Sequence, residues 1–103
     1  MQLRFTRQAL ADLDELKAWL GPRSPKGHRS VAAALSRCIR KLGDHPDAGR
    51  LTAMPDIREL VEPRYGFVIP YTLRRDVIWI LRIYSARRYP LNLSEITRPP
   101  DAS

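Results

Sequence analysis

Arginines gather in the C-terminal third of this sequence, where their type and spacing could do chemistry. Arg74 and Arg75 stand together between two apolar runs, Arg82 lies within the second run, and Arg87 and Arg88 follow it. A guanidinium group is planar and always charged, and it forms paired hydrogen bonds with carboxylate or phosphate oxygens. These residues therefore predict a surface that binds an acidic partner.

The stretch ILRIYSARR carries Tyr84 and ends in Arg87 and Arg88. We interpret the arginine pair as a positively charged group at the end of a strand of the sheet. The rigid strand backbone would hold it against an acidic surface of a partner. The alternative is that the pair forms ion pairs within the chain, for example with Glu59 or Glu62.

The residues that usually serve metal binding or nucleophilic catalysis are sparse. His28 and His45 are isolated, and the sequence has no H-x-x-H or C-x-x-C spacing. Cys38 is the single cysteine, so no intramolecular disulfide can form, and its helical position predicts a small apolar side chain. We expect no metal, no other cofactor and no catalytic residue of these kinds.

Composition narrows the class of protein and of partner. With 103 residues there is room for one small domain. The excess of 18 Lys and Arg over 11 Asp and Glu gives a net charge of +7, which favours nucleic acid, an anionic lipid surface or an acidic protein as partner. The N-terminus lacks the apolar core of a signal peptide, and no apolar run approaches the length of a membrane span. We expect a cytoplasmic protein.

The N-terminal half is predicted to hold a short strand at residues 2 to 5 and a helical hairpin. Thr6 stands where the first helix needs a cap, and Gly21-Pro22 is expected to end that helix. Its apolar residues recur at helical spacing: Ala9, Leu13, Leu16 and Leu20.

The second helix is expected to start at Ser24-Pro25, as cap and first-turn proline, and to close by Gly43 and Pro46. The same helical spacing is repeated by Val31, Leu35, Cys38 and Leu42. Two amphipathic helices joined by a tight turn predict an antiparallel hairpin.

The segment from 44 to 56 reads as a loop, and strands follow it. Residues 57 to 62 form the first, and the next two alternate in polarity: Phe67, Ile69, Tyr71 and Leu73, then Val77, Trp79, Leu81 and Ile83. With the N-terminal strand, this three-stranded meander predicts an antiparallel sheet covered on one face by the helical hairpin, an α+β domain over residues 1 to 90. Pro70 predicts a bulge or an edge, and residues 91 to 103 an extended or partly disordered tail.

Several charged and aromatic residues have a plain structural explanation. We interpret Asp12, Asp14 and Glu15 as a solvent-exposed face of the first helix, with partner contact as the alternative. Trp19 and Trp79 are expected to pack in or around the core rather than to stack on bases.

Basic residues near the end of the second helix, Arg37, Arg40 and Lys41, are expected to complement its dipole. Arg58 and Glu59 are neighbours on a strand, so their side chains point to opposite faces. They should therefore not pair with each other, and one should reach a neighbouring element.

Taken in order, these segments resemble the ParE toxins of the ParE/RelE superfamily, from residue 3 to about 90. The resemblance is carried by TRQALADLDELKAWL, SPKGHRSVAAAL, LGDHPDAGRLTAMPDIRELV and YGFVIPYTLRRDVIWILRIYSARR, in that order and spacing. It implies a helical hairpin on a sheet.

The resemblance also implies a non-enzymatic toxin that poisons DNA gyrase and is neutralised by a ParD-type antitoxin. The antitoxin's partly disordered acidic segment would bury apolar residues and meet basic ones. An apolar groove left vacant would favour self-association. The candidate target-binding or antitoxin-binding residues are Arg74, Arg75, Arg82, Tyr84, Arg87, Arg88, Trp19, Leu16 and Leu35.

Two alternatives stay open. The RelE branch of the superfamily cleaves mRNA on the ribosome with basic residues on the sheet and, in many members, a tyrosine or histidine on an additional C-terminal helix. The residues that could compose such a site here are Arg82, Arg87, Arg88, Tyr84 and Tyr89. However, Val68 occupies the position that often carries a catalytic arginine, and no Tyr or His follows Tyr89. The third class is a small basic DNA-binding protein, although no recognition helix is visible.

Overall fold

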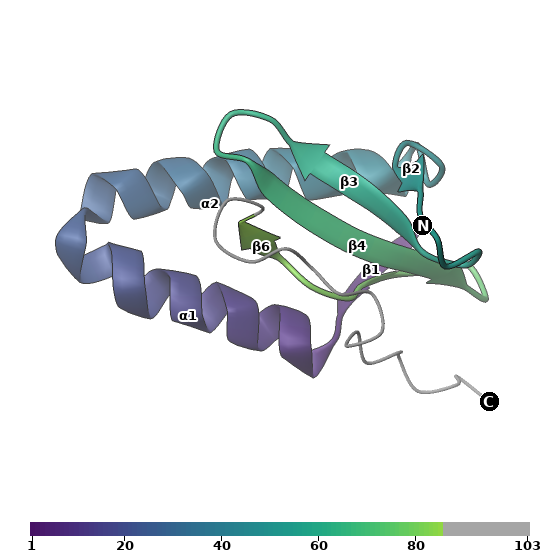
Figure 1. Cartoon of the computed structure of the whole chain (residues 1–103), viewed down its shortest axis with the longest axis horizontal. Coiled ribbons are helices and arrows are strands. Elements are labelled where there is room, and N and C mark those ends of the chain that lie inside the picture. Colours follow the sequence, from purple (N-terminus) through teal and green to yellow (C-terminus); the bar gives the residue numbers. More distant parts are fainter. Residues whose placement is uncertain (86–103) are drawn as a thin grey trace.

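The computed structural model describes residues 1 to 85, which fold into two helices packed on one sheet (Figure 1). The predicted two-layer α+β architecture and helical hairpin are confirmed. The elements in chain order are β1 (Gln2–Phe5), α1 (Arg7–Arg23), α2 (Pro25–Arg40), the 3-10 turn η1 (Lys41–Gly43), β2 (Arg50–Leu51), β3 (Arg58–Glu62), β4 (Phe67–Arg74), β5 (Val77–Ile80) and β6 (Tyr84–Ser85).

The sheet is mixed, so the expectation of a fully antiparallel sheet was wrong. Its strand order is β1-β5-β4-β3-β2, with β6 also pairing with β4. The meander of β3, β4 and β5 is antiparallel as predicted, but β1 runs parallel to β5, with Gln2 opposite Val77. After β1, the helical hairpin carries the chain across one face of the sheet. The chain pairs with β1 again only at β5, and β5 runs in the same direction as β1.

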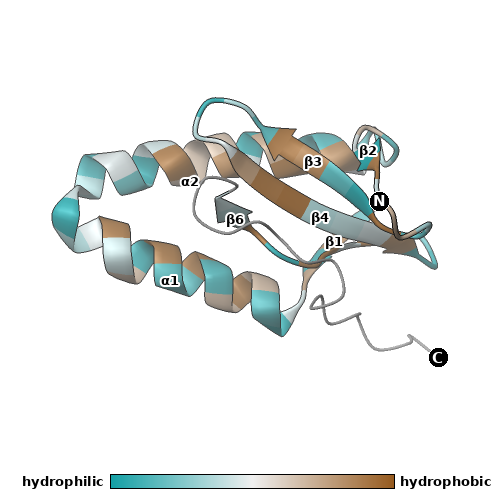
Figure 2. Cartoon of the chain, in the orientation of Figure 1, coloured by the Kyte–Doolittle hydropathy of each residue, from teal (hydrophilic) through white to brown (hydrophobic). Residues whose placement is uncertain are grey.

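The core lies between the helices and one face of the sheet. Figure 2 shows hydrophobic stretches along β3 and β4 and a hydrophilic turn between the helices. Side chains from both layers meet there, each under 10% exposed: Ala9, Val31, Leu35, Ile39, Leu42, Ile69, Tyr71, Ile78, Ile80 and Ile83.

The expected alternation of the last strand was wrong. Ile78 and Ile80 face the helices, whereas Trp79 and Leu81 pack with Ile57 on the other face. The run VIWILRI is apolar at almost every position, so both alternations are possible from the sequence. Only the pairing with β1 and β4 decides which set faces the helices.

Pro70 was expected at a bulge or an edge, and it lies opposite a bulge in the segment 81 to 83. On the side of β4 that faces β5 and β6, the two residues Ile69 and Pro70 lie opposite the three residues 81 to 83. The Leu81 N–H donates to the Pro70 carbonyl oxygen at 2.9 Å, so the nitrogen of Pro70 faces the same interruption. A proline is tolerated there because the ladder lacks a bond at that point.

Helix α1 continues through Gly21 and Pro22 to Arg23, so the expected stop at Gly21-Pro22 was wrong. A residue before proline normally avoids the helical region because its Cβ meets the proline ring, and Gly21 has no Cβ. Ser24 then turns the chain: its N–H donates to Leu20 O at 2.7 Å, and its Oγ accepts the Gly27 N–H at 3.0 Å. The predicted cap of α2 is confirmed.

The segment expected to be a loop contains the short strand β2, which was missed because two residues carry no alternation. Tyr71 ties this segment to the sheet. Its hydroxyl accepts the Gly49 N–H at 2.8 Å and donates to Pro46 O at 2.7 Å. A Cβ on Gly49 would lie 2.7 Å from that hydroxyl, so only glycine fits. The predicted tail, 91 to 103, lies outside the described residues. Among residues 1 to 85, no helix is long and apolar enough to cross a membrane.

Candidate functional site

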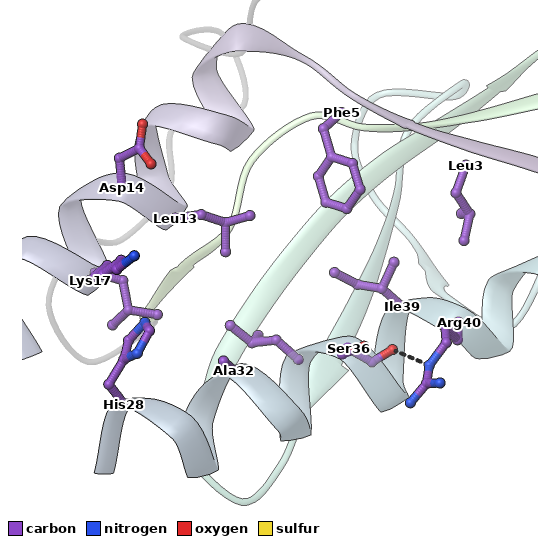
Figure 3. Close-up of a pocket in the computed structure, with 12 residues that line it drawn as sticks. Leu3, Phe5, Leu13, Asp14, Lys17, His28, Ala32, Ser36, Ile39 and Arg40 are labelled. Carbon is purple, nitrogen blue, oxygen red and sulfur yellow. Dashed lines mark hydrogen bonds between the residues drawn. The ribbon is translucent and has the colours of Figure 1, made fainter. Parts of the chain in front are cut away.

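A groove opens between α1, α2 and β1, which we call the hairpin groove. Its volume is about 480 Å³. Figure 3 shows Leu13, Phe5 and Ile39 directed toward one another from α1, β1 and α2. The apolar lining consists of Leu3, Phe5, Leu13, Leu16, Ala32, Leu35 and Ile39. A lining of this kind suits apolar side chains of a partner.

The rim of the hairpin groove is mainly basic. Asp14 and Lys17 come from α1, and His28 and Arg40 from α2. The Arg40 Nε donates to the Ser36 carbonyl oxygen at 3.4 Å, which is drawn in Figure 3. An amphipathic segment with acidic flanks would therefore meet complementary charge here.

The two leucines predicted as binding residues both line this groove, in different ways. Leu16 is half-buried and reaches the surface, whereas Leu35 is 2% exposed and forms part of the core beneath. Sequence reasoning missed Leu3, Phe5 and Ile39. Leu3 and Phe5 lie on one side of the predicted first strand, and that alternation was the available signal.

A second cavity, the α1 cleft, lies between α1 and the chain around β6 and has a volume of about 600 Å³. Trp19, Arg82 and Tyr84, predicted from distant parts of the sequence, all line it. Trp19 is 42% exposed, and the Arg23 guanidinium lies 4.6 Å from the centre of its ring. The structure therefore brings three of the predicted residues to one place.

Arg82 is engaged within the chain by Asp12. Its Nε donates to Asp12 Oδ2 at 2.8 Å and a terminal nitrogen donates to Oδ1 at 3.1 Å, while the Ile83 N–H also donates to Oδ2 at 2.8 Å. The Asp12 side chain is only 11% exposed. Asp12 was wrongly interpreted as part of a solvated face, because only the fold brings position 82 to α1.

Tyr84 is buried, and burial is the main reason that its pKa rises to about 12, with the charge of Glu59 next. Glu59 in turn pairs with Arg50, Nε to Oε1, at 3.2 Å. A phenol in this state holds its proton at neutral pH and is a poor general base.

Arg58 reaches back to the Gly49 carbonyl oxygen at 2.9 Å. The prediction that Arg58 and Glu59 do not pair with each other and that one of them reaches a neighbouring element is confirmed, and in the structure both do.

Arg74 and Arg75 lie at the opposite end of β4 from β6, which pairs with Phe67 and Val68. Six residues of strand separate these ends, or about 20 Å. Arg74 pairs with Asp56 at 3.7 Å, and Arg75 has φ of 50°, a backbone conformation uncommon for a residue with a side chain. Arg74 and Arg75 therefore do not form one site with Arg82.

Arg87 and Arg88 lie outside the described residues, so their predicted role stays a prediction. Within residues 1 to 85, no three His, Cys, Asp or Glu side chains are grouped as ligands of a metal ion would be.

The family model described as the ParE toxin of the type II toxin–antitoxin system parDE matches residues 3–90. The chain belongs to the ParE toxin family. This membership confirms the resemblance carried by the four segments above and makes the chain a ParE-type toxin of a type II toxin–antitoxin system.

Individual relatives agree with this membership. The candidate toxin Y4kP of Sinorhizobium fredii is 29% identical over 89 residues, covering 86% of this chain and 93% of the relative. Toxin RelE2 of Caulobacter vibrioides is 36% identical over 88 residues, covering 84% and 97%. A solved structure described as the chromosomal ParDE system of P. aeruginosa superposes with a TM-score of 0.72 at 28% identity, covering 82% of this chain and 95% of that chain. The ParE-like fold is thereby confirmed.

Proposed function

We propose that this ParE-family chain poisons DNA gyrase and that a co-encoded ParD-type antitoxin neutralises it. The observation that carries the proposal is the family match over residues 3–90. The similarity to a protein from a ParDE system supports an antitoxin as partner. Residues 1 to 85 also lack an arranged set of metal ligands, and the buried Tyr84 is a poor base, so binding rather than catalysis fits this part of the chain.

The hairpin groove is the proposed antitoxin site. Its apolar lining would take apolar side chains of the antitoxin, and Lys17 and Arg40 on the rim would meet acidic flanks. For the target we propose the α1 cleft, with Trp19, Arg82 and Tyr84, and the separate turn at Arg74 and Arg75. Leu35 would act by holding the groove in shape.

Gyrase poisoning is tested by incubating the purified chain with gyrase, ATP and supercoiled plasmid, then digesting protein and resolving the DNA. Linear plasmid should accumulate, and equimolar antitoxin should suppress it. Unchanged plasmid over a full range of toxin concentrations would contradict the proposal.

The second candidate function is cleavage of mRNA on the ribosome. The specific observation in its favour is the 36% identity to a protein named toxin RelE2. Against it, Val68 is 5% exposed and supplies no charge to the sheet. Primer extension on mRNA from translating ribosomes tests this function directly. Cuts within codons, with no linear plasmid in the gyrase assay, would assign the chain to the RelE branch.

A further inference from the structure

The positive charge of this chain is concentrated in one segment. From residue 16 to residue 43 there is no Asp or Glu, and the segment holds seven Lys and Arg. The rest of the chain has eleven basic and eleven acidic residues, so this segment accounts for the whole net charge of +7. The seven are Lys17, Arg23, Lys26, Arg29, Arg37, Arg40 and Lys41.

In the structure this segment is the second half of α1 together with α2 and η1, and all seven basic side chains are exposed. Four of them form a stripe along α2, which we call the α2 stripe: Lys26, Arg29, Arg37 and Arg40. At about 100° per residue they fall within an arc of about 80° and extend over about 21 Å of helix. The residues that α2 buries, such as Val31 and Leu35, lie on the opposite side.

Helix stability explains only half of this stripe. Arg37 and Arg40 lie in the last turns of α2, where positive charge complements the helix dipole. Lys26 lies in the first turn, where the dipole favours negative charge and which contains no acidic residue, and Arg29 is the fifth residue of the helix, beyond that turn. Lys26 therefore opposes the helix dipole and Arg29 gains nothing from it, which points to a role outside the fold.

The surroundings of the α2 stripe discriminate between kinds of polyanion. Protein interfaces depend on large apolar or aromatic anchors, and none of the exposed large hydrophobic residues in the described part of the chain lies on α2. Insertion of a helix into a membrane interface needs an exposed apolar helix face, and α2 buries its apolar face in the core. Contacts to phosphates need neither a large apolar anchor nor an exposed apolar helix face. The small residue Ala33, exposed in the middle of the stripe, allows a close approach of the helix.

We infer that the α2 stripe binds the sugar–phosphate backbone of duplex DNA, without reading its sequence. Each arginine can pair with phosphate oxygens, and regularly spaced phosphates match a row of cations along a helix. This inference concerns bare DNA and the purified chain, so it does not depend on the proposed action on gyrase.

The test is fluorescence anisotropy with a labelled 20-base-pair duplex of arbitrary sequence. Four phosphate contacts predict that affinity falls roughly 100-fold between 50 and 200 mM salt, and that unrelated duplexes bind equally. In the double variant Arg29→Glu/Arg37→Glu, affinity at 50 mM salt should fall roughly 10-fold or more, with a shallower salt dependence.

The matched control is Arg7→Glu/Arg64→Glu, which changes the net charge equally at two exposed positions outside the segment. Circular dichroism checks that both variants fold. Equal losses in the two variants, or no binding at 50 mM salt, would overturn the inference. It would also be overturned if poly-L-glutamate displaced the duplex as well as unlabelled DNA does at the same charge concentration, because the stripe would then accept any polyanion.

Discussion

At the scale of single residues, Tyr84 shows how the fold changes a side chain's chemistry. Burial raises its pKa to about 12, whereas a tyrosine in an unfolded chain titrates near pH 10. The folded protein therefore holds this proton more tightly than the unfolded chain does. The stability that this provides is complete below about pH 10 and is lost as the pH rises through about 12.

We predict that the free energy of unfolding falls more steeply between pH 9 and pH 11.5 in the native chain than in Tyr84→Phe. Urea denaturation at a series of pH values measures this. The comparison matters because burial also raises the pKa of Tyr71, which titrates in both proteins. Parallel pH profiles for the two proteins would show that Tyr84 is not linked to folding.

At the scale of elements, Asp12 ties α1 to the chain that follows β5 by hydrogen bonds. It accepts three hydrogen bonds there, two from Arg82 and one from the Ile83 N–H. Both side chains are largely buried, so the pair is less screened than a surface ion pair. This tie also positions Arg82 and Tyr84 at the α1 cleft.

Asp12→Asn should lower the free energy of unfolding by about 2 kcal/mol, because Arg82 loses its carboxylate partner while it remains partly buried. Thermal or urea unfolding at pH 7 measures the change. Asp14→Asn is the control, since Asp14 is exposed on the same helix and should change stability by less than about 0.5 kcal/mol. Equal effects of the two substitutions would show that the tie contributes nothing specific.

The end of α1 makes a second prediction at this scale, concerning Gly21 and Pro22. Apart from the adjacent residues, the nearest atom to a Cβ at Gly21 would be Lys17 Cγ at 4.0 Å, an ordinary van der Waals distance. Gly21→Ala should nevertheless destabilise the native chain, because the new Cβ would meet the ring of Pro22 in helical backbone.

In a Pro22→Ala background, the same Gly21→Ala substitution should stabilise by about 0.5–1 kcal/mol, as expected for alanine in a helix. Unfolding curves of the four proteins form a double-mutant cycle. The prediction is wrong if Gly21→Ala has the same sign in both backgrounds.

At the scale of the whole molecule, α2 contributes to two adjoining surfaces, the hairpin groove and the α2 stripe, which share Arg40. Ala32 lines the hairpin groove, whereas its neighbour Ala33 is exposed in the middle of the α2 stripe. The groove is proposed for the antitoxin and the stripe for DNA, so the two alanines can be tested against each other.

Ala32→Trp should fill the hairpin groove and weaken antitoxin binding roughly 100-fold, a loss of about 2.7 kcal/mol. Ala33→Trp should leave antitoxin binding within about threefold and instead weaken DNA binding by holding the helix away from phosphates. Calorimetry with the antitoxin and anisotropy with the duplex measure both. Two variants that lose antitoxin binding equally would remove the groove as the docking site.

The sequence by itself determined the elements whose signals are local. Helical spacing of apolar residues, the caps at Thr6 and Ser24, and the interruption of the ladder at Pro70 depend on neighbours within a few positions, so the helical hairpin and the antiparallel meander could be predicted. The order of four segments also predicted the family that the comparison with family models confirmed.

Only the tertiary structure decided which distant residues meet. The parallel pairing of β1 with β5, which also helps to decide the face of the run VIWILRI, and the bonds between Asp12 and Arg82 join positions about 70 residues apart. Likewise, Arg74 and Arg82 are close in sequence but lie toward opposite ends of the sheet. No local pattern carries such information, because these contacts result from how whole elements cross and pack.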